Sequence, residues 1–198
     1  IKIIFHDPKF WWSLFVTTVY GGISIPLGIA ASLGLALLLN NKLYGKSFFR
    51  SAFFLPNILD MLVVGIIWTL IYAPQYGALA QITGHYLGEE QFLFKQGLLS
   101  HPYTALPAVV FAMVLKGAGF GMVLFLAALQ NIPDSVYEAA DIDGATAWEQ
   151  FWHITLPLLR PIIFFMVITG IIGSLNAFTE IYAMTSGGPQ TVVQGETL

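Results

Sequence analysis

The sequence has no cysteine and few charged residues. Of its 198 residues, 10% are charged and 57% are hydrophobic. The absence of cysteine excludes disulfide bonds and cysteine metal ligands. Because a soluble globular domain is about 25% charged, the composition excludes that class and indicates a protein whose solvent is the lipid bilayer.

Several functional motifs are also missing. No Gly-x-x-x-x-Gly-Lys-[Ser/Thr] loop occurs, so we expect this chain to bind no nucleotide. The sequence shows no Ser-His-Asp or paired-carboxylate arrangement, so it predicts no catalytic residues and no cofactor. We also expect no nucleic acid partner. No metal site is expected, because metal-ligand spacing is absent from the four histidines, His6, His85, His101 and His153.

The beginning of the chain has no features of a secretory signal. Ile1 is not an initiator, and no charged region precedes a small-residue cleavage site. We therefore interpret residues 1–198 as a fragment that forms a single transmembrane domain.

Four apolar runs are long enough to cross a bilayer, which takes roughly 20 residues. Helix is the expected form, because every backbone polar group in lipid needs an internal partner. The sequence thus predicts an all-α, polytopic helical bundle. The four spans are about Trp11–Leu39, Ala52–Tyr72, Tyr103–Leu129 and Pro161–Ala183.

The short connections predict the orientation. The connection at residues 40–50 contains no acid and three cations, Lys42, Lys46 and Arg50. The positive-inside rule places it in the cytoplasm. Alternation then places the segment Asn131–Arg160 inside, and the segments Pro74–Pro102 and beyond Thr185 outside.

Small residues recur along one side of the first span. Gly21, Ser24, Gly28 and Ser32 share one helical stripe. In lipid, such a stripe allows close helix packing, so we expect a helix interface there.

The polar segment Asn131–Arg160 has helix signals. Pro133 and Asp134 suit a first helical turn, and we expect that helix to reach about Ile142. Asp143-Gly144 predicts a turn with positive φ at the glycine. Thr146 to Glu149 has the spacing of a capping box for a second short helix, which should end before Pro157. The segment is predicted to be an ordered helix–turn–helix at the membrane surface, suited to meet another protein.

This segment resembles a known family. It contains Glu-Ala-Ala-x-x-Asp-Gly-Ala followed by Phe-x-x-Ile-x-Leu-Pro-x-x-x-Pro, from Glu138 to Pro161. The pattern is similar to the EAA signature of permease subunits of binding-protein-dependent ABC importers. Further stretches resemble the carbohydrate-uptake branch, among them Phe54–Asn57 and Thr185–Pro189, whereas Leu115 and Asp60 depart from its pattern.

The resemblance implies a fold, a location and partners. The fold would be that of a type I importer permease, with four spans present and the flanking spans missing. The location would be a bacterial-type cytoplasmic membrane. The partners would be cytoplasmic ATPase subunits, a second, related permease subunit and an extracytoplasmic solute-binding protein. That protein would bind near Tyr76–His101 and Thr185–Gln190.

The resemblance also implies a role for the segment 131–160, which we call the coupling loop. In the family this loop inserts into a groove of the ATPase. The residues that would dock here are Glu138, Ala139, Ala140, Asp143 and Gly144.

A substrate path is predicted from polar residues within the spans. Thr169, Gly173, Asn176 and Glu180 share one stripe of the fourth span, and Lys116 and Asp60 are charges in other spans. Charges in lipid usually face a cavity or a partner. Hydrogen bonds between helices, or charges that reach the interface, explain the same residues equally simply.

The sequence therefore predicts a permease subunit of an ABC importer for a sugar or sugar derivative, with ATP hydrolysis in the partner subunits. The alternatives are a permease for an amino acid, peptide or polyamine, and a membrane-embedded enzyme or non-transporting scaffold.

Overall fold

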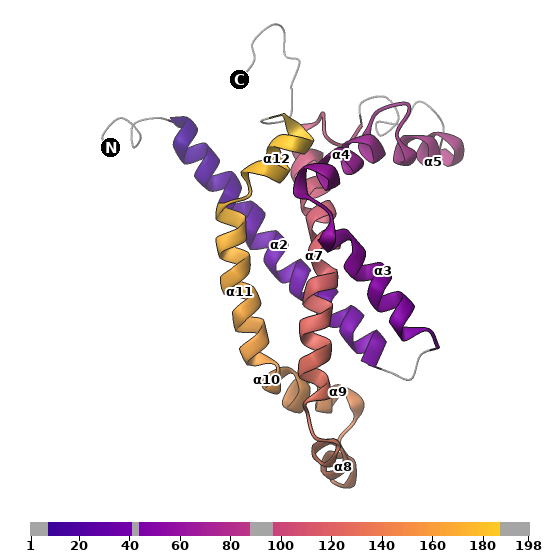
Figure 1. Ribbon diagram of the computed structural model, residues 1–198. Helices are drawn as coiled ribbons and strands as arrows, with labels where there is room; N and C mark the ends of the chain where they lie inside the picture. Colours follow the sequence, from indigo (N-terminus) through magenta and orange to yellow (C-terminus); the bar gives the residue numbers. More distant parts are fainter. Residues whose placement is uncertain (1–7, 41–43, 88–96, 187–198) are drawn as a thin grey trace, which may run out of the picture.

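The computed structural model describes residues 8–40, 44–87 and 97–186, and these residues form helices without any strand (Figure 1). The predicted all-α class is confirmed for this part of the chain. Its elements in chain order are α2 (Pro8–Asn40), α3 (Lys46–Ile58), α4 (Met61–Tyr72), α5 (Ala78–Leu87), α7 (Pro102–Gln130), α8 (Asp134–Ile142), α9 (Ala147–Gln150), the π-helix η1 (Phe151–Thr155), α10 (Leu156–Leu158), α11 (Arg160–Leu175) and α12 (Phe178–Thr185).

Helices α2 and α7 are the two long spans. Their apolar parts, Phe10–Asn40 and Tyr103–Gln130, are long enough to cross a membrane and confirm the first and third predicted spans. The helices pack closely where Ser32 of α2 meets Gly121 of α7, because an added Cβ at Gly121 would clash with the serine side chain.

The small-residue stripe of α2 is only partly a packing face. A Cβ at Gly21 would lie 2.8 Å from the hydroxyl of Ser174 on α11, so this glycine permits a close helix contact. By contrast, nothing lies within 4 Å of a Cβ at Gly28, and Ser24 and Gly28 line a cavity instead.

The second predicted span is not one straight helix. Helices α3 and α4 meet at an angle of 102°. The carboxylate of Asp60 accepts a hydrogen bond of 2.8 Å from the backbone N–H of Leu62 and caps α4. An aspartate that caps a helix starts a new one, which explains the break.

The fourth predicted span is also interrupted. Helix α11 ends at Leu175, and α12 begins at Phe178. The side-chain amide of Asn176 donates to the carbonyl of Ile172 at 2.8 Å and satisfies the end of α11. Thr169 and Glu180 therefore lie on different helices rather than on one stripe.

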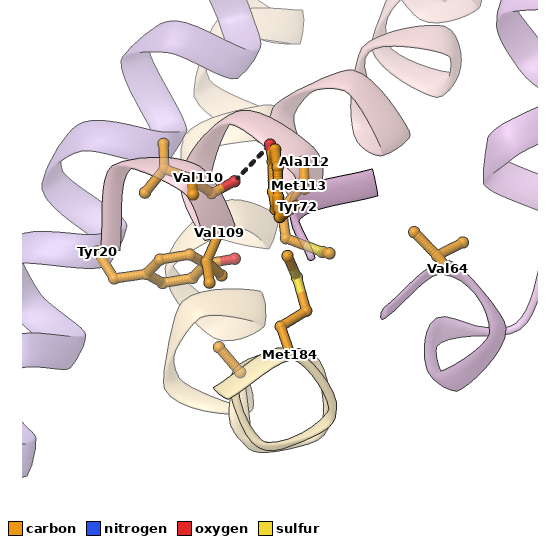
Figure 2. Close-up of a cluster of buried hydrophobic side chains, with 10 residues drawn as sticks. Tyr20, Val64, Tyr72, Val109, Val110, Ala112, Met113 and Met184 are labelled. Atoms are coloured by element: carbon orange, nitrogen blue, oxygen red, sulfur yellow. Dashed lines mark hydrogen bonds between the residues drawn. The ribbon is translucent and has the colours of Figure 1, made fainter. Parts of the chain in front are cut away.

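Two buried clusters hold the helices together. One joins α2, α7 and the start of α11 around Met122, Phe125 and Leu159. The other joins α4, α7 and α12, and Figure 2 shows part of it around Val109 and Met184. There the hydroxyl of Tyr72 donates to the carbonyl of Ala108 at 3.2 Å.

The two ends of the molecule differ. Figure 1 shows α8 at the end where α2 finishes and α3 begins, whereas α5 and α12 lie at the opposite end. The predicted topology requires this arrangement. Parts of the predicted receptor-binding segments, residues 88–96 and 187–190, lie outside the described residues.

Candidate functional site: a coupling loop and a polar cavity

The coupling loop has a fixed turn between α8 and α9. Gly144 has φ +78°, as predicted. The N–H of Ala145 donates to the carbonyl of Ala140 at 2.9 Å, and the N–H of Gly144 donates to that of Asp141 at 3.1 Å. These two bonds form a Schellman motif, the helix ending that favours glycine at this position.

The next helix has the predicted capping box. The backbone N–H of Thr146 donates to Glu149 Oε2 at 2.8 Å, and the N–H of Glu149 donates to Thr146 Oγ1 at 3.4 Å. The hydrogen bonds from the backbone and then the hydroxyl of Thr146 hold the pKa of Glu149 below its ordinary value. Burial opposes this shift, and His153 adds to it.

The sequence predicted that the second helix ends before Pro157, and this prediction is wrong. It continues to Leu158 through the π-helix η1, in which the N–H of Leu156 donates to the carbonyl of Phe151. In an α-helix the ring of Pro157 would clash with the carbonyl four residues earlier. The wider π turn accommodates the proline.

Two side-chain contacts tie the loop together. The hydroxyls of Tyr137 and Thr155 lie 3.0 Å apart, and Gln150 Nε2 donates to Asp141 Oδ1 at 2.6 Å. The pairs connect α8 to the stretch that follows it. The loop is consequently an ordered unit.

The residues predicted for docking do not all face outward. Glu138, Ala139, Asp143 and Gly144 are exposed, whereas Ala140 is 8% exposed and faces the interior of the loop. Ala140 is thus buried in this conformation, and the other four residues are accessible at the surface of the loop.

A cavity of about 640 Å³ opens among α2, α3, α4, α7, α11 and α12. Most residues predicted for the substrate path line this cavity. They do so although α11 ends at Leu175, before Asn176 and Glu180. The predicted residues on its wall are Lys116, Thr169, Gly173, Asn176 and Glu180. The cavity therefore brings together, through tertiary packing, the four residues that the sequence analysis assigned to a single helical stripe and Lys116 from another span.

Asp60 is not among the cavity-lining residues and does not fit the predicted substrate path. Its carboxylate is exposed and caps α4, while its neighbour Met61 lines the cavity. A local capping role accounts for this charge in a predicted span.

Two ionisable residues line the cavity, Lys116 and Glu180. Glu180 is 7% exposed. The structure records no direct ion pair between these two residues. One cation and one carboxylate thus share the cavity.

The sequence analysis missed several polar groups of the cavity. Asn57 lies on α3, in a stretch noted only for its family resemblance, and Thr179 lies on α12 beside Glu180. Ser32 also lines the cavity, and its buried hydroxyl has no hydrogen-bond partner among the described residues. Membership of a packing stripe gave no signal that Ser32 would face this space.

The fold and the site define a class: a multi-pass membrane protein in which an ordered surface loop connects two helices that line a largely apolar cavity with several polar groups on its wall. Residues 24–197 match the family described as the binding-protein-dependent transport system inner membrane component. The chain belongs to this family and is therefore a multi-pass inner membrane component.

Relatives support the assignment. The chain is 36% identical over 188 residues to the probable ABC transporter permease protein YurN of Bacillus subtilis, covering 94% of this chain and 63% of YurN. It is 35% identical to the lactose transport system permease protein LacF of Rhizobium radiobacter, covering 94% and 62%. For the trehalose/maltose transport system permease protein MalF of Thermococcus litoralis, the identity is 38% and the coverage 91% and 60%.

The chain spans about three-fifths of the length of these relatives. Its fold is similar to that of a chain in the crystal structure of a bacterial ABC transporter involved in the import of the acidic polysaccharide alginate. The TM-score is 0.77 at 23% identity, with 92% of this chain and 66% of the other covered.

Proposed function

We propose that the protein is the permease subunit of an ABC importer that moves a sugar or sugar derivative inward across the cytoplasmic membrane. Its partners would be cytoplasmic ATPase subunits, a second permease subunit and an extracytoplasmic solute-binding protein. ATP hydrolysis would take place in the ATPase subunits, so this chain would be a transport subunit and not an enzyme.

The observation that carries the proposal is a physical connection between loop and cavity. Helix α7 carries Lys116 on the cavity wall and leads directly into the coupling loop. The loop then leads into α11, which carries Thr169 on the same wall. A force applied to α8 would reach both helices, as conversion of ATPase motion into opening and closing of the cavity requires.

The chemistry of the cavity supports a sugar. Its volume of about 640 Å³ lies within the roughly 300–1,000 Å³ typical of ligand sites. The amides of Asn57 and Asn176 can both donate and accept hydrogen bonds, as sugar hydroxyls require. The wall carries one basic and one acidic side chain, Lys116 and Glu180, and so has no excess of one sign of charge that would select a charged solute.

The relatives point the same way. LacF and MalF are named for lactose and for trehalose and maltose.

The proposal is tested by uptake in cells that lack this protein, with and without the restored wild-type gene. Radiolabelled neutral oligosaccharides, amino acids, a peptide and a polyamine serve as solutes. We expect the gene to restore the uptake of at least one saccharide and an ATPase subunit to purify with the protein.

Two results would contradict the proposal. Restored uptake of only amino acids, peptides or polyamines would reject the sugar and keep the importer. No restored uptake, together with no copurifying ATPase, would indicate a membrane scaffold.

A further inference from the structure

The stretch from α9 through η1 to α10 lies across the end of the bundle. Residues Ala147–Leu158 form a bent pair with α11, and the angle between them is 62°. Figure 1 shows α9 and α10 between the ends of α7 and α11 on one side and α8 on the other. The stretch is therefore the part of the coupling loop that lies next to the ends of the membrane spans.

Three aromatic rings gather on this stretch, and we call them the aromatic cluster: Trp148, Phe151 and Trp152. Their ring centroids lie 6.1 Å apart for Trp148 and Phe151, 5.6 Å for Trp148 and Trp152, and 5.5 Å for Phe151 and Trp152. Phe151 also packs against the buried cluster around Phe125. The core of the protein therefore supports the aromatic cluster through Phe151.

The two tryptophans are nevertheless open to the surroundings. Trp148 is 68% exposed and Trp152 is 47% exposed. Neither indole N–H has a hydrogen-bond partner within the described residues. Two large amphipathic rings in edge-to-face contact, both exposed, need an environment that accepts both an apolar face and an N–H donor.

The polar residues of the stretch lie on other sides of it than the aromatic cluster. Gln150 faces α8 through its bond to Asp141. Glu149 and His153 are exposed, four residues apart, and joined by a contact of 3.0 Å between His153 Nδ1 and the carbonyl of Glu149. The stretch thus separates a polar stripe from an aromatic one, as helices that lie in a membrane interface do.

Large apolar side chains are also exposed after the cluster in the chain. They are Leu158 of α10 and Phe164 and Phe165 of α11. Arg160, also exposed, lies between them in sequence and offers a cation to lipid phosphate. Exposed apolar side chains thus occur both on the stretch and on α11, a helix of an inner membrane component.

We propose that the aromatic cluster is seated in the headgroup region of the lipid leaflet on the α8 side. The apolar faces of Trp148 and Trp152 lie toward the acyl chains, and their N–H groups donate to lipid carbonyl or phosphate oxygens. Tryptophan is enriched at this depth for these two reasons. The lipid then fixes the depth of the coupling loop and leaves α8 free to meet a protein partner.

A protein partner fits the aromatic cluster less well than it fits α8. The exposed surface of α8 carries carboxylates, among them Asp134 and Glu138, which would meet a basic protein groove. The aromatic cluster offers no charge and lies on the stretch that leads into α11. The bilayer is the partner whose chemistry matches uncharged amphipathic rings beside a membrane span.

The test uses spin labels in the complete transporter, reconstituted in vesicles of phosphatidylethanolamine and phosphatidylglycerol. The described sequence needs no prior cysteine removal, since it contains none. A nitroxide is attached to Trp152→Cys and, as the matched control one residue away, to His153→Cys. Collision rates are measured with oxygen, which concentrates in lipid, and with an uncharged nickel chelate, which stays in water.

We expect the label at position 152 to collide more often with oxygen and the label at 153 more often with the chelate. A label at 152 that favours the chelate would place the cluster in water and overturn the proposal. A label at 152 that neither reagent reaches would show that protein covers the cluster, which also overturns it.

A second measurement avoids the cysteine substitution. The native fluorescence of the transporter is recorded in vesicles whose lipids carry bromine near the carbonyl end of the acyl chains. Wild type should be quenched more strongly than the conservative Trp148→Phe/Trp152→Phe variant. Equal fractional quenching of both proteins would contradict contact between the cluster and lipid.

Discussion

The coupling loop and the cavity are organised in opposite ways. In the loop, neighbours in sequence hold each other: Thr146 with Glu149, and Gly144 with Asp141. In the cavity, the wall comes from helices that are far apart in the chain, such as Asn57 on α3 and Glu180 on α12. The loop is thus a locally determined rigid element, and the cavity depends on how the helices pack.

This difference suits a machine that transmits force. A rigid loop passes a displacement on without absorbing it. A cavity formed between packed helices can change shape when those helices move, because within the part of the chain that the structure describes no dense hydrogen-bond network fixes its wall. Substitutions in the two regions should therefore have different effects. Loop variants should stay folded but lose the coupling of ATP hydrolysis to transport, whereas cavity variants should change the recognition of the solute.

The largest contrast concerns the two ends of the molecule. Single cysteines at Ala139 on α8 and Ile82 on α5, both exposed, are matched probes of opposite ends. In intact cells, an impermeant thiol reagent should label Ile82→Cys and leave Ala139→Cys unlabelled until the membrane is opened, because the positive-inside rule predicts a cytoplasmic position for the connection before α3. The opposite pattern would reverse the assigned topology and the side of the coupling loop.

The substitution Gly144→Val should abolish most transport. Gly144 has φ +78°, and a β-branched residue is strained there. No atom lies within 4 Å of an added Cβ, so the strain comes from the backbone and not from a clash. We expect wild-type amounts in the membrane but loss of ATP-driven uptake.

The control for this substitution is Gly144→Asn, because asparagine tolerates positive φ. It should keep most of the uptake. Normal uptake in Gly144→Val cells would show that the Schellman turn is not needed for coupling.

How much of each region the sequence could predict follows from the same difference. The capping box and the glycine turn were predicted because their signals lie within four residues. The breaks at Asp60 and Asn176 were missed because hydropathy averages over a window, whereas one side-chain cap ends a helix. Only the packing of distant helices could reveal that Ser32 and Asn57 face the cavity.

The extent of the second loop helix was missed for a related reason. The rule that helices end before proline assumes α geometry, and the wider turn of η1 at Phe151–Thr155 removes that assumption. No feature of the sequence of this turn predicts the π form. The turn itself contains two residues of the aromatic cluster, Phe151 and Trp152.

In the cavity, Asn176→Leu should weaken transport several-fold to about tenfold. One net hydrogen bond contributes about 0.5–1.5 kcal/mol, and about 1.4 kcal/mol is a tenfold change in affinity. Saccharide affinity is measured by uptake kinetics, with basal ATPase activity largely kept.

The structural alternative predicts a different result, because Asn176 also donates to Ile172 at the end of α11. If that bond is its only role, the leucine variant should melt at a lower temperature and transport normally per assembled complex. Asn57→Leu is the matched variant, since it removes a cavity amide on another helix. Weaker transport by both variants would assign the effect to the cavity.

The smallest expected effect is a pH dependence confined to the loop. Hydrogen bonds from Thr146 hold the pKa of Glu149 below its ordinary value of about 4.5. A carboxyl whose pKa is lowered on folding stabilises the fold above the unfolded pKa, and the contribution is lost as the pH falls through the lower folded value. The start of α9 should therefore loosen only in acid, below about pH 4.5.

Amide hydrogen exchange at Glu149, corrected for its intrinsic pH dependence, should lose protection below that pH in wild type. In Glu149→Gln, whose neutral amide keeps an acceptor at the same position, protection should not change with pH. A parallel loss in both proteins would mean that another group titrates and that the capping box does not respond to protons.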